Sequence, residues 1–127
     1  MKTILPKFKF KGAGIVINAP APLEKEFIKL GLGNAFDKKL KSENTVIFIN
    51  NSKELLDFLN KQLKNIECDS VLWFAYPKGT SKIKTDINRD SIWKTASEYG
   101  LDTVTAISID DTWSGLRFRP LEKVGKK

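Results

Sequence analysis

The sequence predicts one α/β domain with a reduced Rossmann-like fold, a three-layer sandwich with a mostly parallel sheet and a C-terminal antiparallel hairpin. Three continuous apolar runs, typical of strands buried on both faces, alternate with amphipathic helical patterns. This alternation predicts right-handed crossovers and helices on both faces of the sheet. With 127 residues, 41% of them hydrophobic, the chain can bury a single core. We expect one domain over residues 1–127, with flexible basic ends at 1–6 and 120–127.

The first half of the chain has the patterns of an edge segment, two strands and two helices. Residues 7–11 alternate lysine and phenylalanine, which predicts a short extended segment. Residues 13–18 and 45–49 are continuous apolar runs and predict buried strands. One helix is expected from Pro22, because proline suits a first turn, and another from Asn51. Their predicted buried stripes are Leu23, Phe27 and Leu30 in the first helix and Leu56, Leu59 and Leu63 in the second.

The second half adds a strand, a helix and a strand pair. Residues 70–76 form a third apolar run that ends at a proline, and a helix is expected to begin near Asp86 or Asn88. Residues 103–109 and 116–119 alternate apolar and polar side chains around a short polar turn, which predicts a hairpin. The predicted stripe of the third helix is Ile92, Ala96 and Tyr99. The predicted order is therefore β-α-β-α-β-α-β-β.

Composition excludes several classes of function. The chain has no histidine, which excludes histidine-dependent catalytic triads and ordinary zinc sites, and we expect no metal. Cys68 is the only cysteine, so it cannot form an internal disulfide, and this fits a reducing, cytoplasmic location. No apolar run is long enough to cross a membrane. The net charge of +7 lies mainly in residues 1–11, with four lysines, and 120–127, with three. These ends leave a nucleic-acid accessory role open.

Polar segments follow the three predicted parallel strands, and ligands commonly bind beyond the carboxyl ends of such strands. The third segment, which begins at Tyr76, is the strongest candidate for a ligand site, because its glycine, hydroxyls and lysines suit a phosphate or carboxylate. The candidate ligand-binding residues are Asn18, Asn50, Asn51, Tyr76, Lys78, Thr80, Ser81 and Trp113. Structural roles are open for several of them. Asparagines at strand ends commonly cap helices, Asn51 with Glu54 resembles a capping box, and Trp113 also suits the core.

The sequence offers no convincing catalytic or cofactor-binding motif. The polar loop matches neither a P-loop nor a Gly-x-Gly-x-x-Gly fingerprint, so we expect no cofactor. Asp110 and Asp111 are neighbours whose side chains point to opposite sides of an extended chain. Ser81 with Lys78 or Lys82 would form a serine–lysine pair only if the lysine were desolvated.

Two resemblances follow from particular segments. Residues 72–78 (LWFAYPK), 84–86 (KTD) and 111–116 (DTWSGL) resemble a bacterial family known as domain of unknown function 3052 (DUF3052), and the turn at 18–20 is similar too. This resemblance implies a Rossmann-like fold and bacterial origin, but no catalytic residue. The closing strand pair also resembles the C-terminal half of S-adenosylmethionine-dependent methyltransferases. The chain lacks their glycine-rich loop after the first strand and their acidic residue after the second.

The function predicted from these observations is a non-catalytic binding domain for a small anionic ligand or a protein partner. It rests on polar loops that converge without an acid–base pair. The alternatives left open are a histidine-independent enzyme or degenerate methyltransferase-like protein, and a lysine-tailed nucleic-acid accessory protein.

Overall fold

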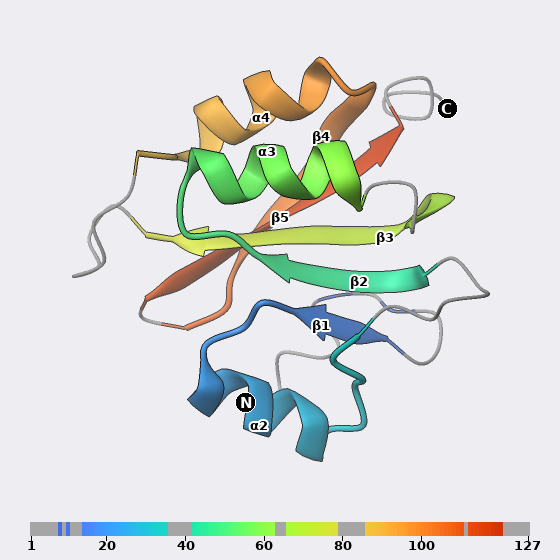
Figure 1. The fold of residues 1–127 in the computed structure, drawn as a ribbon, viewed down its shortest axis with the longest axis vertical. Coiled ribbons are helices and arrows are strands. Elements are labelled where there is room, and N and C mark those ends of the chain that lie inside the picture. Colours follow the sequence, from blue (N-terminus) through green and yellow to red (C-terminus); the bar gives the residue numbers. More distant parts are fainter. Residues whose placement is uncertain are drawn as a thin grey trace.

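A five-stranded sheet runs through the protein, with helices packed against it (Figure 1). The structure is a computed structural model, and it describes residues 8, 10, 14–35, 42–62, 66–78, 86–110 and 112–120. The strands are β1 (Ile15–Ile17), β2 (Ser42–Phe48), β3 (Ile66–Pro77), β4 (Leu101–Ser108) and β5 (Trp113–Pro120). The helices are α2 (Ala21–Lys29), α3 (Ser52–Lys61) and α4 (Arg89–Ser97). The ends of the chain were predicted to be flexible. Residues 1–6 and 121–127 of these ends lie outside the described residues.

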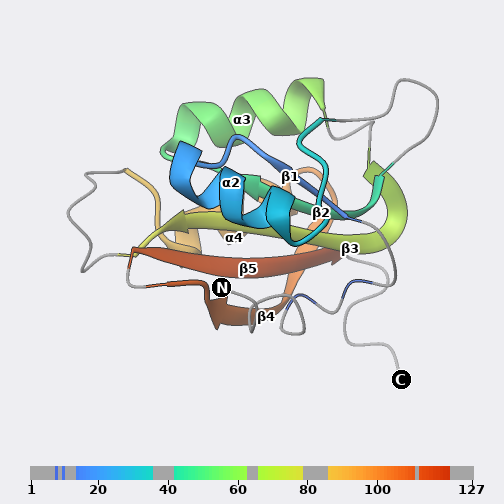
Figure 2. The ribbon, with the colours of Figure 1, turned by 90° about the horizontal axis from the view of Figure 1, so that it is seen from below.

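The sheet is mixed, with the strand order β1-β2-β3-β5-β4. β1, β2 and β3 are parallel, whereas β5 lies between β3 and β4 and is antiparallel to both (Figure 2). The predicted mostly parallel Rossmann-like sandwich is therefore wrong. The antiparallel ladders run along the eight-residue strands β4 and β5, while the parallel edge strand β1 has three residues. Hydrophobic alternation identifies a strand but does not specify which edge of the sheet it joins, and here β5 lies beside β3 while β4 takes the edge of the sheet.

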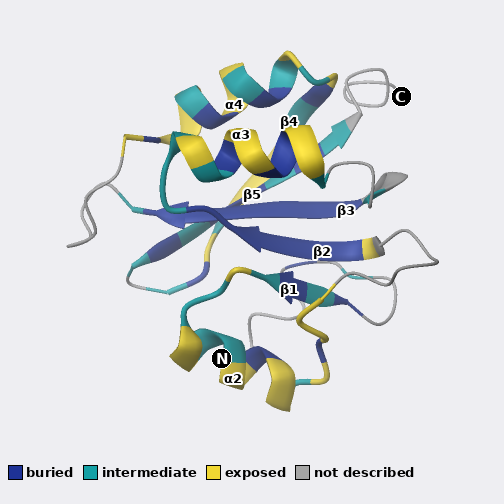
Figure 3. Cartoon of the chain, in the orientation of Figure 1, coloured by how far each residue is buried: buried dark blue, intermediate teal, exposed yellow. Residues whose placement is uncertain are grey.

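Alternate residues of the central strands pack into two separate clusters, one on each face of the sheet. Figure 3 shows β2 and β3 buried over most of their length. One face packs against α3 and α4, and its aromatic contacts include Phe58 on Phe74, with ring centroids 5.4 Å apart. The other face packs against α2, where the ring of Phe27 lies 6.1 Å from that of Phe48. Both faces therefore belong to the core.

Phe8 joins the N-terminal segment to the second of these clusters. Its side chain is fully buried, and its carbonyl oxygen accepts a hydrogen bond of 2.9 Å from Nε1 of Trp73. The ring of Phe10 stacks on that of Phe8 at 5.4 Å. Phe8 has helical backbone geometry, so the extended conformation predicted for this segment is wrong at that residue. Residues 7, 9 and 11 lie outside the described residues.

The helices bury the stripes expected from their apolar spacing, with one correction. Phe27 of α2 and both Ile92 and Ala96 of α4 are buried as predicted. In α3 the buried residues are Leu55, Phe58 and Leu59, whereas Leu56 is 41% exposed. We predicted a buried face from the spacing of the leucines, which begins at Leu56. The face that is buried includes the larger Phe58 and begins one residue earlier, at Leu55. Leu63 lies outside the described residues.

Candidate functional site

The carboxyl ends of β1, β2 and β3 lie along one edge of the sheet, together with the first turns of α3 and α4 (left in Figure 1). This is the edge at which the sequence predicted a ligand. The candidate residues described there divide into two groups with opposite electrostatic character. One group surrounds a carboxylate at the start of α3, and the other surrounds an ammonium group at the end of β3.

The first group, here called the asparagine cluster, consists of Asn18, Asn50, Asn51 and Glu54. Oε1 of Glu54 accepts hydrogen bonds from Nδ2 of Asn18 at 2.9 Å and from the backbone N and Nδ2 of Asn50 at 2.9 and 3.0 Å. Nδ2 of Asn18 also donates to the carbonyl of Phe48 at 2.9 Å. Asn18 has φ = 63°, a left-handed conformation that asparagine tolerates better than most residues. The two strand-end asparagines thus hold one carboxylate.

Asn51 caps α3, because its side chain accepts a 2.9 Å hydrogen bond from the backbone N of Glu54. The other half of the predicted capping box differs, since the Glu54 carboxylate binds the backbone N–H of Asn50 instead of that of Asn51. The next N–H, that of Ser52, donates to Asp86. Two side-chain carboxylates therefore occupy the start of α3, where a helix would otherwise attract an external anion.

A groove of about 420 Å³ opens beside the asparagine cluster, between the end of β1 and α3. Its lining is partly apolar and partly charged, and includes Ile17, Asn18, Glu54, Asp57, Phe58 and Lys61. None of the three charged residues was predicted to bind a ligand, and Glu54 was named only as part of a capping box, because charges on a helix are usually part of its solvated side. Their spacing of three and four residues was the available signal, since it places them on one face of α3.

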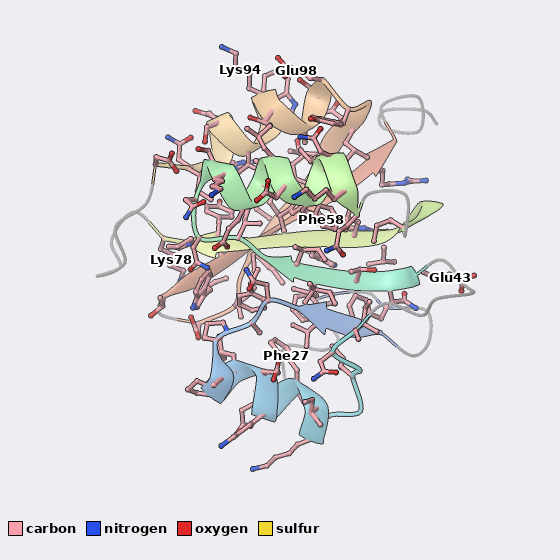
Figure 4. The ribbon with its side chains drawn as sticks, viewed as in Figure 1. Phe27, Glu43, Phe58, Lys78, Lys94 and Glu98 are labelled. Carbon is pink, nitrogen blue, oxygen red and sulfur yellow. The ribbon has the colours of Figure 1, made fainter. Side chains whose placement is uncertain are left out.

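The second group, here called the hydroxyl row, consists of Tyr76, Ser114 and Ser108. The strand register pairs Tyr76 with Ser114 and Ser114 with Ser108, so the three side chains lie across β3, β5 and β4. Lys78 follows the end of β3 (Figure 4), and its Nζ donates a 2.7 Å hydrogen bond to Oγ of Ser108. The backbone N of Lys78 donates to the carbonyl of Thr112 at 2.8 Å, which holds the start of this segment against β5.

The environment of Tyr76 keeps its hydroxyl protonated. Burial raises the pKa of Tyr76, while the positive charge of Arg89 and a side-chain hydrogen bond with Ser114 offset only part of that rise. The negative charge of Asp90 raises the pKa slightly further. The first turn of α4, which contains Arg89 and Asp90, is therefore close enough to act electrostatically on the hydroxyl row.

The other candidate residues lie elsewhere. Trp113 is buried in the cluster on the opposite face of the sheet from Tyr76, and its ring packs edge-on against Phe48 at 5.0 Å. Thr80 and Ser81 lie outside the described residues, so the considered pairing of Ser81 with Lys78 is not described. Among the described residues, Lys78 contacts Ser108, which was not a candidate in the sequence.

Comparison with family models, with curated proteins and with solved structures finds no match to this chain. The resemblances to DUF3052 and to methyltransferases therefore stay predictions. Among the helices of the described residues, none is both long and apolar enough to cross a membrane.

Proposed function

We propose that this protein is a non-catalytic binding domain and that a small anion binds at the hydroxyl row beside Lys78. The observation that carries this proposal is the 2.7 Å hydrogen bond from Nζ of Lys78 to Oγ of Ser108. An ammonium group has three donors, so one can hold Ser108 while the others bind an anion. The hydrogen bond holds the flexible lysine side chain at the Ser108 end of the hydroxyl row, which reduces the entropy lost on binding.

The charges around this site favour a negatively charged ligand. Lys78 and Arg89 supply two positive charges, and the first turn of α4 adds the partial positive charge of a helix N-terminus. Asp90 opposes them. The carboxylate of Asp110 is turned away into its own loop, where it accepts hydrogen bonds of 2.8 Å from the backbone N of both Thr112 and Trp113. Within the part of the chain that the structure describes, the positive charges of Lys78 and Arg89 therefore outweigh the negative charge of Asp90.

The same geometry argues against catalysis by a serine–lysine pair. A lysine that acts as a base has to be desolvated, whereas Ser108 is exposed and Lys78 is only partly buried. In the contact itself, Nζ donates to the serine oxygen. The hydroxyl of Ser108 in turn lies 3.4 Å from the carbonyl of Asp110. Binding, and not nucleophilic attack, is the role that this arrangement supports.

The proposal is tested by adding inorganic phosphate to isotopically labelled protein at constant ionic strength and recording amide shifts by NMR. Saturable shifts are expected at Lys78, Ser108 and Ser114, and K78M should remove them. The matched control is K94M, since Lys94 is an exposed lysine on α4, far from Lys78 in Figure 4. Equal phosphate binding by K78M and wild-type protein would contradict the proposal, as would the absence of saturable shifts in the wild type.

Location and a role of the basic ends are separate parts of the proposal. We propose a cytoplasmic location because the single cysteine fits a reducing compartment.

The three lysines after Pro120 support weak, salt-sensitive attraction to polyanions. Removing residues 121–127 should reduce retention on a nucleic-acid column at low salt without changing the phosphate titration, which separates this attraction from binding at Lys78.

A further inference from the structure

We infer that the groove beside α3 is a second binding site and that its ligand is a short zwitterionic peptide. The ammonium group of the ligand would lie at Glu54, its apolar body against Ile17 and Phe58, and its carboxylate at Lys61. This site differs from the hydroxyl row in both position and charge. The groove has a volume of about 420 Å³, which lies in the usual range of small-molecule sites, roughly 300–1,000 Å³.

The acidic end of the groove is held in place before any ligand arrives. Three N–H donors bind Oε1 of Glu54 at 2.9 to 3.0 Å, from Asn18 and Asn50. A carboxylate has about four acceptor positions, so the second oxygen can still accept hydrogen bonds from an ammonium group. Asp57 lies one helical turn further along the same face of α3 and adds a second negative charge to the groove.

The middle of the groove is apolar and rigid. Phe58 is 6% exposed, and its ring packs edge-on against Phe74 in the core, which fixes the wall of the groove on the α3 side. Ile17 is partly buried and packs against the same core cluster from β1. An aliphatic side chain of a ligand would remove apolar surface from water here, which a fully polar ion would not.

The opposite end of the groove carries a positive charge. Lys61 lies seven residues after Glu54 on α3, which is about two helical turns or roughly 10 Å along the axis. An extended peptide spans about 3.3–3.6 Å per residue, so three residues cover about the same distance. A tripeptide with free ends therefore places its ammonium and carboxylate groups at the two charged ends together.

The experiment uses the tripeptide Leu-Gly-Gly in three forms, with both ends free, with an acetylated amino end and with an amidated carboxyl end. Binding is followed by calorimetry and by NMR shifts of Glu54, Asp57 and Lys61. In the wild-type protein, acetylation should weaken binding about tenfold or more, the effect of one charge-assisted hydrogen bond. E54Q should weaken binding of the free peptide but leave that of the acetylated form nearly unchanged, because the two changes remove the same contact.

A second variant keeps the test independent of the hydrogen bonds around Glu54. Lys61 is exposed, so K61M should fold normally, and it should remove the preference for a free carboxylate over an amide. K94M on α4 and E98Q, at the residue directly after α4, are matched controls and should bind all forms like the wild type. Equal affinity of the wild type for the free, acetylated and amidated peptides would overturn the inference. Phosphate shifts at Lys78 would be unaffected by that outcome, so the two proposals fail separately.

Discussion

The carboxylate of Asp86 accepts two hydrogen bonds from Ser52, one of 2.8 Å from the backbone N to Oδ1 and one of 2.6 Å from Oγ to Oδ2. These bonds join the segment before α4 to the first turn of α3. They stabilise the ionised form, so the pKa of Asp86 lies below its ordinary value of 3.8, with the side-chain hydrogen bond of Ser52 as the largest cause. This contact also connects the two helices that cover one face of the sheet.

Asp86→Asn should lower the thermal unfolding temperature at pH 7. Because the pKa is lower in the folded than in the unfolded state, the charged Asp86 stabilises the fold above about pH 4, and this contribution is lost as the pH falls through the folded-state pKa. The difference between D86N and wild type should therefore shrink in unfolding curves recorded by circular dichroism from pH 7 to pH 2.5. A constant difference would argue against this linkage. S52A should have less effect in the D86N background than in the wild type.

Trp73→Phe should reduce the free energy of unfolding by about 2–4 kcal/mol, from lost volume and an unpaired buried carbonyl. The indole of Trp73 is fully buried and its Nε1 binds the carbonyl of Phe8. Urea unfolding curves measure the change. Trp93→Phe is the matched control, because Trp93 is 46% exposed and donates to Asp102 at the surface. Similar decreases in the free energy of unfolding in the two variants would show that the buried hydrogen bond from Trp73 to Phe8 contributes little to stability.

Asn18→Gly should be more stable than Asn18→Ala. Both changes remove the hydrogen bonds to Phe48 and Glu54, but only alanine places a Cβ on a residue with φ = 63° without the compensating side-chain contacts. The expected difference in the free energy of unfolding is about 1 kcal/mol, measured by chemical unfolding. A more stable alanine variant would contradict this prediction. It would show that the backbone at residue 18 leaves the left-handed conformation on mutation at little cost in free energy.

Gly14→Ala should destabilise the protein by about 1–3 kcal/mol through overpacking. A Cβ at Gly14 would lie 2.6 Å from Cδ2 of Phe10 and 3.2 Å from the backbone oxygen of Asn44, so the Phe10 ring has to move. Gly33→Ala is the control, since among the described residues its Cβ would meet the side chain of Ile15 at 3.3 Å and nothing closer. Unfolding curves that rank G33A below G14A would contradict the packing argument.

Periodicity predicted the elements better than it predicted their arrangement. The runs around Val46 and Trp73 are strands whose side chains are buried on both faces of the sheet, and Asn88 caps the third helix where it was expected to begin. The order of strands in the sheet depends on which hydrogen-bonding edge is free when a strand docks. Local sequence has little information about that choice, so the insertion of β5 was not foreseen.

The candidate site was predicted in the same partial way. The carboxyl-end rule for parallel strands predicted that Asn18 and Asn50 would lie together, but it did not predict that Glu54 would lie between them. In the sequence, carboxylates such as Glu54 and Asp86 have the pattern of a solvated surface. Their hydrogen-bond partners Asn18 and Ser52 lie 36 and 34 residues away along the chain, so local patterns do not reveal them. The contact of Lys78 with Ser108 was missed for the same reason, since it spans two elements of the fold.

The position of β5 also determines when the sheet can be completed during synthesis. β3 and β4 both leave the ribosome before the strand that lies between them. A nascent chain that stops before Trp113 therefore exposes one edge of β3, and the partners of Phe74 and Ala75 in that ladder, Leu116 and Gly115, do not yet exist. Such an open apolar edge is prone to pair with other chains. Closure of the sheet is thus a late event, because its central antiparallel strand is the last of the described strands to be made.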